Sequence, residues 1–330
     1  MNNILLYSRQ LEDYFLNKNY NGISPFSIVN NNDTIFLTAG IQPILREFRN
    51  GNLSNTKRLY ISQPVIRTQF ADSISEGSSI AFINSTTAGF NISEEEHDEL
   101  VNDWLELFEI IGLRSSNITS YSKNYERLWG DLLVSGRKTF YYYNDLELGD
   151  TTFFTNVTKD GNNIGIDTMS DVGFGLERIR WSANSRNSYF DLYSDSKCIL
   201  PSVKAYLSAI ALLCVNDVAP SNKNSGYRFR LFSKKLAFLL DGKKLTLEEE
   251  KYLLECLNYW KDWQKVNKSV KFEIIQKEYI RNCNRYIIEK LTQEGYTNLS
   301  GININVSRDE MAKKLYSAGV EMPKIRKYYK

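Results

Sequence analysis

The sequence has few of the residues on which much enzyme chemistry depends. Its 330 residues include one histidine, His97, and four cysteines, Cys198, Cys214, Cys256 and Cys283. The cysteines lie far apart without a CxxC pair, so we expect reduced thiols and no zinc site. There is also no GxxxxGK[ST] phosphate loop, no GxSxG elbow and no HExxH motif. Reactions that need those motifs are excluded, and chemistry that depends on positioning and electrostatics is favoured.

Long apolar runs are also absent. No segment approaches the roughly 18 uninterrupted apolar residues of a membrane-spanning helix, and the start, MNNILLYSRQLEDYF, reaches charged residues too soon for a secretory signal. With 42% hydrophobic and 24% charged residues, the composition is typical of a folded protein with one large and one smaller domain. We therefore expect a cytoplasmic protein that contacts no membrane.

Charge is distributed unevenly along the chain. Of the 41 basic and 39 acidic residues, 23 and 13 lie in 221–330, which gives +10 there and leaves −8 in the residues before it. Clustered cations gain affinity for polyanions through phosphate contacts and counterion release. This asymmetry favours a catalytic front half and a nucleic-acid-binding back half. A Lys-rich helical face that is simply solvated is the alternative.

Hydrophobic periodicity predicts an α/β front half. Segments 5–17 and 93–112 have helical spacing, and the second begins at Ser93 with acidic residues and ends at Gly112. Five β-rich runs are interrupted by Gly, Pro and Ser, which fits antiparallel strands. These runs are 34–40, 58–70, 79–90, 138–144 and 150–158.

The back half is predicted to be helical. Segment 171–181 has the pattern of a strand that runs into a helix, and after about residue 196 helical spacing continues almost to the end, apart from 301–307. Strands with embedded helices followed by helices alone predict an antiparallel α/β catalytic domain at 1–195 and a helical domain at 196–330.

Two arginines lie in settings suited to phosphate chemistry. Arg67 ends the run QPVIR before a long loop at 71–79, and Arg178 follows the turn GFGLE, which lacks the third glycine of a dinucleotide fingerprint. Adenylation of a carboxylate needs no general base, because the enzyme has only to bring the ionised carboxylate to the α-phosphate and stabilise the developing charge. A guanidinium fork fits phosphate oxygens well. For each arginine taken alone, an ordinary surface position is the alternative.

Six segments, in this order, resemble segments of alanyl-tRNA synthetases. They are DTIFLTAGIQPI, SQPVIRTQ, WGD…GRKTFYYY, DVGFGLERI, DVAPSNKNSGYRFR and AKKLY, and the resemblance covers nearly the whole chain. DVGFGLERI resembles the third motif of class II aminoacyl-tRNA synthetases, and VAPSNKNSGYRFR resembles the start of the tRNA-recognition domain. The resemblance implies a class II antiparallel sheet with helices, followed by a helical tRNA-recognition-like domain.

The resemblance also implies roles for residues of the front half. Arg67 would contact the α-phosphate of ATP and the amino-acid carboxylate, Phe82 would stack on adenine, and Arg178 would hold the γ-phosphate beside Gly175. Mg²⁺ would accompany the nucleotide, and no metal site formed by the protein alone is expected.

The amino acid would be held by further residues of the same region. Asp171 would pair with the α-ammonium group, Gly173 would let the backbone approach a small amino acid, and Trp129 would form a pocket wall. Core packing is the alternative for Phe82 and Trp129.

In the back half the resemblance implies tRNA contacts. Asn222 would lie near the minor groove of the acceptor stem, where shape and a few edge contacts are recognised. An acidic residue near the last segment would correspond to Asp309 or Glu310. Phosphate contacts would come from Arg228, Arg230, Lys234 and Lys235.

The chain departs from the family at two places. Segment 68–82 is shorter than the family's Gly-rich, His-containing loop, and 148–150 reads LGD where the family has IWN. We also expect no editing domain, because its metal site needs a His/Cys set that one histidine cannot supply.

These features predict ATP-dependent activation of a small amino acid, alanine by resemblance, and its transfer to tRNA. One alternative is a biosynthetic ligase that transfers the activated amino acid to a carrier protein or a small molecule. A second is a non-catalytic tRNA-binding paralogue. No other protein partner is expected.

Overall fold

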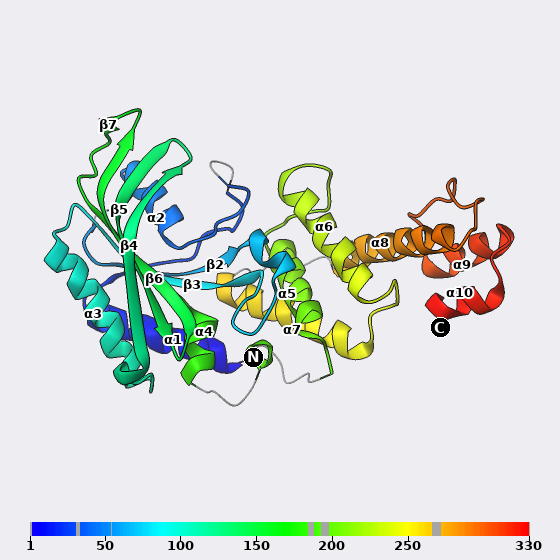
Figure 1. The fold of residues 1–330 in the computed structure, drawn as a ribbon, viewed down its shortest axis with the longest axis horizontal. Coiled ribbons are helices and arrows are strands. Elements are labelled where there is room, and N and C mark those ends of the chain that lie inside the picture. The colour runs from blue at the N-terminus through cyan, green and yellow to red at the C-terminus, as the bar shows by residue number, and fades with distance from the viewer. Residues whose placement is uncertain are drawn as a thin grey trace. The chain divides into compact units, whose positions relative to one another are not determined.

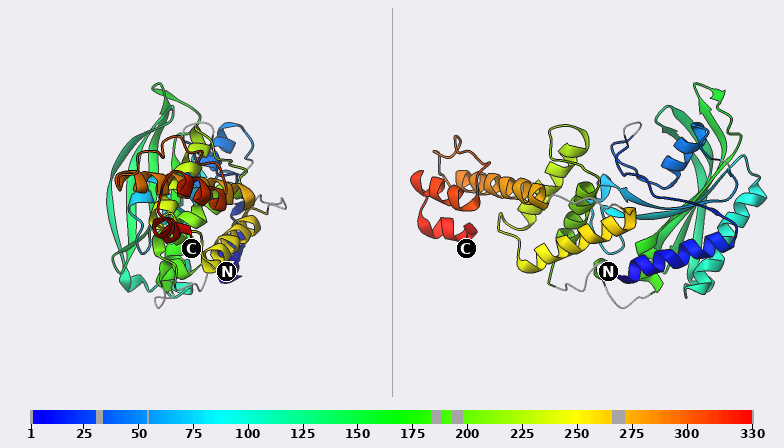
Figure 2. Two further views of the ribbon diagram at one scale, coloured as in Figure 1. Left: turned by 90° about the vertical axis from the view of Figure 1, so that its right-hand side faces the viewer. Right: turned by 180° about the vertical axis from the view of Figure 1, so that it is seen from behind.

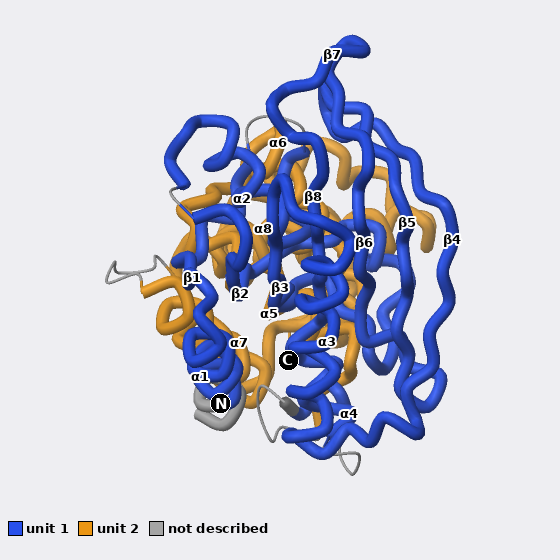
Figure 3. Tube along the Cα trace, turned by 90° about the vertical axis from the view of Figure 1, so that its left-hand side faces the viewer, with its two compact units in different colours: residues 1–193 blue, residues 194–330 orange. Residues whose placement is uncertain are grey.

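The computed structural model describes residues 2–30, 34–53, 55–183, 188–192, 198–265 and 272–329. The chain forms two compact units, Met1–Tyr193 and Ser194–Lys330 (Figure 3).

A mostly antiparallel sheet forms the centre of the first unit (Figure 1). Its strand order is β1-β2-β3-β8-β6-β5-β4, with β7 paired to β6; β1 and β2 are parallel, and the other neighbours are antiparallel. The strands are β1 (Asn21–Ile23), β2 (Leu59–Ile66), β3 (Ala81–Phe90), β4 (Ile118–Trp129), β5 (Leu132–Tyr143), β6 (Leu146–Lys159), β7 (Asn162–Asn163) and β8 (Met169–Gly175).

Helices α1 (Asn2–Asn17) and α3 (Glu94–Ile110) cover one face of this sheet (Figure 2). The buried Trp104 of α3 has its ring centroid 4.7 Å from that of Phe15 and 4.9 Å from that of Phe174, and its Nε1 donates to Thr87 Oγ1 at 2.9 Å. Phe15 stacks on Tyr60 at 4.7 Å. Large aromatic rings such as these bury much apolar surface, so this layer holds α1 and α3 against the sheet.

Helix α3 begins and ends where its sequence predicts. The Ser93 side chain accepts from Glu96 N, and the Glu96 side chain accepts from Ser93 N, so the two form a reciprocal capping box. Beyond the other end, Gly112 has φ +91°, a conformation that favours glycine.

The opposite face of the sheet carries α2 (Ile41–Arg49) and a second apolar cluster. Ile41 and Ile44 of α2 pack with Ile61 of β2, Phe90 of β3 and Phe154 of β6. Helix α4 (Leu176–Ala183) follows β8 directly, as the pattern of 171–181 predicts. Short 3-10 turns complete the unit; they are η1 (Thr68–Asp72), η2 (Ser115–Asn117) and η3 (Tyr189–Leu192).

The prediction of a strand at 34–40 is wrong. Only Phe36 of this segment forms an isolated bridge, with Val29. The Gln42 side chain instead accepts from the backbone N–H groups of Thr38 and Ala39, at 2.7 and 3.2 Å, just before α2 begins. These local bonds satisfy the backbone donors that a strand would place in a ladder.

The regular elements of the second unit are all helices in the parts described, as predicted. α5 is buried along almost its entire length and contacts α6 and α7, while α8 packs on α6. A separate apolar cluster joins the end of α8 to α9 and α10. The helices are α5 (Pro201–Val215), α6 (Asn224–Leu239), α7 (Leu247–Gln264), α8 (Phe272–Gln293), α9 (Arg308–Ser317) and α10 (Met322–Tyr329).

The predicted fold class is thereby confirmed as an antiparallel-dominated sheet with helices, followed by a C-terminal helical unit. Among the helices described, none combines the length and the apolar character needed to cross a bilayer.

Candidate active site

Polar side chains lie on the face of the sheet that α1 and α3 leave uncovered. Gly173 of β8 is directly opposite Thr86 of β3 and Asp150 of β6. Directly opposite residues of an antiparallel pair share a face, and alternate residues along a strand do too. Asp171 and Asn84 therefore lie on this face, while Phe174 and Thr87 point toward α3.

Glycines leave a shallow floor between these side chains. A Cβ on Gly173 would lie 3.3 Å from Thr86 Oγ1 and 3.4 Å from Asn84 Nδ2. Asn84 Oδ1 accepts from Gly40 N at 2.8 Å and from Thr86 Oγ1 at 3.1 Å, which fixes both side chains. Gly173 and Gly175 thus present only backbone on this floor, with Thr86 and Asn84 close beside Gly173 and Arg178 close beside Gly175.

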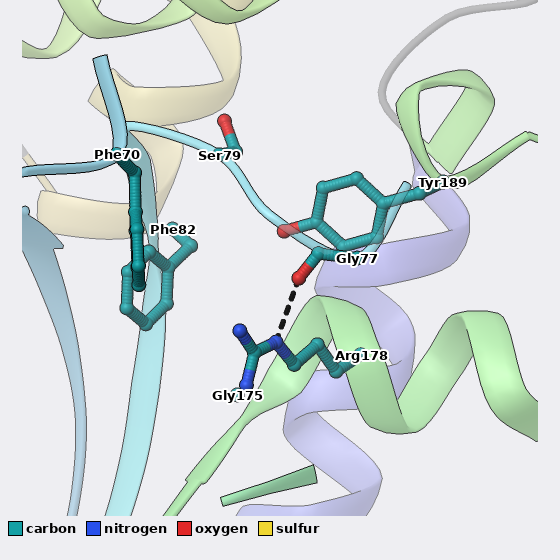
Figure 4. A pocket seen from close by; sticks show the side chains of 7 residues that line it. All are labelled: Phe70, Gly77, Ser79, Phe82, Gly175, Arg178 and Tyr189. Atoms are coloured by element: carbon teal, nitrogen blue, oxygen red, sulfur yellow. Dashed lines mark hydrogen bonds between the residues drawn. The ribbon is translucent and has the colours of Figure 1, made fainter. Parts of the chain in front are cut away.

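A pocket lies at Gly175, at the end of β8 (Figure 4). The space among its lining atoms, part of it open to solvent, is about 200 Å³. Arg178 lies at its side, where Nε donates to Gly77 O at 2.7 Å and Nη1 donates to Glu147 O at 2.8 Å. The pocket is lined by Phe70, Gly77, Ser79, Phe82, Gly175, Arg178 and Tyr189.

Arg67 lies at the end of β2, beside this pocket. Its Nε donates to Thr38 O at 2.9 Å, and its guanidinium carbon is 5.0 Å from the centroid of the Phe82 ring. Burial lowers the pKa of Arg67. The charges of Asp150, Arg178, Glu147 and Asp171 also act on its guanidinium group. The fold therefore brings Arg67 and Phe82 near Asp171 and Arg178, which come much later in the sequence.

Asp171 is the unusual acid of the site. Among the described residues no side chain or backbone group forms a hydrogen bond or an ion pair with its carboxylate. Burial and, next, the negative charge of Asp150 raise the pKa of Asp171 to about 7, although Lys138 and Arg67 act in the opposite direction. Asp150 itself has a cation, since Lys138 Nζ is 2.7 Å from its Oδ1. Asp171 is thus an acid with a strongly raised pKa, the kind of group that is often found at functional sites.

The sequence interpretation did not single out several residues of this site. Glu177 is fully buried, and both of its carboxylate oxygens accept a hydrogen bond from Ile83 N at 3.0 Å. This contact ties the start of α4 to β3. That contact positions Arg178 and Phe82 across the pocket. Period-two alternation along β3 could have found Asn84 and Thr86, but nothing in the sequence indicates that Lys138 faces Asp150.

Trp129 is not brought to the floor. Its Nε1 donates to Tyr125 Oη at 3.0 Å, and its ring packs edge-on against Phe154 at 5.2 Å. Lys138 Nζ lies 5.0 Å from the Tyr125 ring, so Trp129 is separated from Asp150 by two intervening side chains. Its contacts are those of the apolar cluster, in keeping with the core-packing alternative.

The basic residues expected to contact tRNA lie on α6 of the second unit. Lys234 and Lys235 are exposed, and Arg228 is half-buried. Arg230 instead has partners within the unit, because Nη1 donates to Asn222 Oδ1 and Nε lies 3.7 Å from Glu278 Oε1.

The acidic candidates near the end of the chain lie elsewhere in this unit. Asp309 and Glu310 form the first turn of α9, where Glu310 N donates to Ser307 Oγ at 3.2 Å and Glu310 pairs with Lys314 at 3.4 Å.

No protein-family model matches this sequence, and no curated protein matches it. Among solved structures, the chain is similar to PylSc of Desulfitobacterium hafniense, a pyrrolysyl-tRNA synthetase. The TM-score is 0.41 at 15% identity, and the match covers 60% of this chain and 72% of that one. The chemistry of the site is therefore inferred from its own residues.

Proposed function

We propose that the first unit uses ATP to activate a small amino acid as an aminoacyl-adenylate, in the manner of class II aminoacyl-tRNA synthetases. The second unit would engage tRNA, the acceptor, and such charging would take place in the cytoplasm. One observation carries the proposal. Along β8 and into α4, the order of groups is an unpaired carboxylate, a bare glycine floor and an arginine beside an aromatic pocket.

That order matches the order of groups in an amino acid joined to a nucleotide. Asp171 would bind the α-ammonium, and Gly173 would lie under the α-carbon. Arg67 would meet the carboxylate and the α-phosphate at the junction. Alternate residues on a strand are about 7 Å apart, so Gly173 lies about 7 Å and Gly175 about 14 Å along β8 from Asp171. The base and the outer phosphates would then reach Phe82 and Arg178.

The pocket residues fit a nucleotide. Phe82 offers an aromatic ring, Gly175 leaves the backbone open, and Arg178 has a guanidinium suited to phosphate oxygens. Arg178 now donates to Gly77 O and Glu147 O, so it would exchange these acceptors for phosphate. No group of three or more His, Cys, Asp or Glu among the residues described could hold a metal, so Mg²⁺ would arrive with the nucleotide.

The residues need to perform no proton transfer in this reaction. The ionised substrate carboxylate attacks the α-phosphorus, the new bond joins the carboxylate oxygen to AMP, and pyrophosphate leaves. Arg67 would neutralise the charge that develops on the α-phosphate oxygens, and its buried position strengthens that interaction. Asp171 would hold the amino acid so that the carboxylate faces the phosphate.

A pyrophosphate-exchange screen over the amino acids, with and without tRNA, tests the proposal. We expect exchange with one or a few small amino acids and charging of tRNA. A protein that catalyses exchange but neither charges tRNA nor binds it in a salt-dependent way would indicate a different acceptor. That acceptor would be a carrier protein or a small molecule. Tight tRNA binding with no exchange would indicate a non-catalytic tRNA-binding protein and contradict the proposal.

A further inference from the structure

A charged pair forms one side of the glycine floor. Asp150 of β6 is directly opposite Gly173, and Lys138 of β5 is directly opposite Thr152, which is opposite Asp171. Lys138 Nζ lies 2.7 Å from Asp150 Oδ1, and the two side chains are 18% and 25% exposed. The pair is thus partly shielded but accessible from the floor.

Aromatic rings keep the lysine in this position. Lys138 Nζ is 5.0 Å from the centroid of the Tyr125 ring and 5.4 Å from that of Phe140. Cation–π attraction to two rings and the ion pair to Asp150 together restrict the ammonium group. The pair is therefore part of a fixed wall.

The other side of the floor is closed. Thr86 and Ala88 on β3 are fully buried, and the Thr86 hydroxyl already donates to Asn84 Oδ1. Gly40 packs so closely on Thr86 that a Cβ on Gly40 would lie 2.5 Å from Thr86 Oγ1. A substrate side chain that starts above Gly173 therefore extends toward Asp150.

Asp150 would accept a hydrogen bond from that side chain. Among the described residues Lys138 is its one polar partner. A methyl group placed against the pair would displace water from two charges and replace none of its hydrogen bonds, which is costly. A hydroxyl would donate to the carboxylate and avoid that cost.

The charges of the wall select among polar side chains. The charges of Asp150 and Lys138 cancel, and the α-ammonium group of the substrate would pair with the Asp171 carboxylate. A second ammonium would face Lys138 without a counter-charge, and a side-chain carboxylate would face Asp150 and Asp171. A neutral donor is left.

We infer that Asp150 and Lys138 are specificity residues that select a small amino acid with a side-chain hydroxyl over its apolar isostere. The inference rests on the proposed amino-acid site at Asp171, and it differs from the alanine that the sequence resemblance implies.

Three amino acids of matched size test this inference. Serine carries the hydroxyl, 2-aminobutyrate replaces it by a methyl, and 2,3-diaminopropionate replaces it by an amine. In pyrophosphate exchange with the unmodified protein, we expect kcat/KM for serine to exceed both others by about 10- to 100-fold, the usual value of a hydrogen bond to a charged group. Alanine should also fall below serine.

A double variant then identifies the source of the preference. Asp150→Leu combined with Lys138→Met removes the pair without leaving an unpaired charge. The serine to 2-aminobutyrate ratio should fall to within about threefold. Lys123→Met is the matched control, because Lys123 is opposite Lys138 and lies 5.0 Å from Phe140 but has no contact with Asp150. Its ratio should remain that of the parent.

The outcomes separate the two proposals. Exchange by the unmodified protein that favours alanine or 2-aminobutyrate would overturn the role of Asp150 and Lys138 while leaving amino-acid activation in place. A double variant that still prefers serine by tenfold or more would overturn it too. Absence of exchange with every amino acid would overturn both this inference and the proposed function.

Discussion

The raised pKa of Asp171 gives amino-acid binding a pH dependence that can be measured. Only the ionised carboxylate can pair with an α-ammonium group, and the pKa of Asp171 in the empty site is about 7. By simple titration, about a tenth of the protein has ionised Asp171 at pH 6 and about nine-tenths at pH 8. The apparent KM for the amino acid should therefore rise about tenfold as pH falls from 8 to 6.

Few other groups complicate this window. The chain has one histidine, His97, and burial lowers its pKa to about 4, below the range of the assay. The substrate ammonium stays charged throughout. In the proposed site the KM for ATP would depend on Arg67, Phe82 and Arg178, and we expect it to change little between pH 6 and 8.

Asp171→Asn removes the titration and the charge but keeps the shape. Loss of an ion pair in a partly buried site costs a few kcal/mol, so the amino-acid KM should rise on the order of 100-fold and become independent of pH. Pyrophosphate exchange at several fixed pH values, with each substrate varied in turn, gives both KM values. Equal increases in the KM for ATP and for the amino acid would show that Asp171 has a structural role instead.

Asp171→Asn weakens amino-acid binding but is expected to stabilise the folded protein at high pH. An acid whose folded-state pKa exceeds its unfolded value of 3.8 keeps its proton in the folded state between pH 3.8 and 7, so stability declines as pH rises through that window. Above pH 7 the cost of Asp171 reaches a few kcal/mol. Asp171→Asn should therefore raise the free energy of unfolding at pH 8 and change it little at pH 4. A variant less stable than the parent at pH 8 would refute this reasoning.

Three further predictions address other parts of the chain. Arg67→Ala should lower pyrophosphate exchange about 100-fold or more, as loss of a transition-state donor does, and near-normal exchange would contradict its assignment. Neutralising Arg228, Lys234 and Lys235 together, while keeping Arg230 because it contacts Asn222, should weaken tRNA binding and reduce its salt slope by about one per lost contact, with exchange unchanged. For His97, whose folded pKa of about 4 is below the ordinary 6.5, stability should be complete above pH 6.5 and fall by about 3 kcal/mol as pH drops toward 4. His97→Asn should flatten that part of the unfolding curve, and an unchanged slope would refute it.

Much of the fold could be predicted from periodicity and end signals. Ser93 and its acidic first turn predict the start of α3, and β-rich composition predicts β2, β3, β5 and β6. The run 34–40 was misassigned because its β-rich composition says nothing of Gln42, whose side chain caps the backbone before α2. Strand β4 was missed, since its alternation runs through charged and polar residues that occupy an edge of the sheet.

The site was harder to predict than the fold, for a physical reason. The sequence indicates Arg67 and Arg178 because a guanidinium group suits phosphate chemistry, and their roles stay predictions. Lys138 could not be chosen in the same way, because its importance depends on lying opposite Thr152 and next to Asp150. Register is set by the pairing of whole strands, and a slip of one residue would turn every one of these side chains to the other face.

That dependence on register explains why buried polar contacts surround the site. Phe90 of β3 and Met169 of β8 pack in the apolar cluster on this face, and the segment with Asp171 and Gly173 needs a further constraint on how the two strands align. The Glu177 carboxylate bonded to Ile83 N and the Asn84 amide bonded to Gly40 N supply that constraint from outside the ladder. Each contact would be left with an unsatisfied buried group if the register changed, at a cost of several kcal/mol. The polar network thus holds Asp150, Asp171 and Arg67 in the arrangement that the proposed amino-acid site requires.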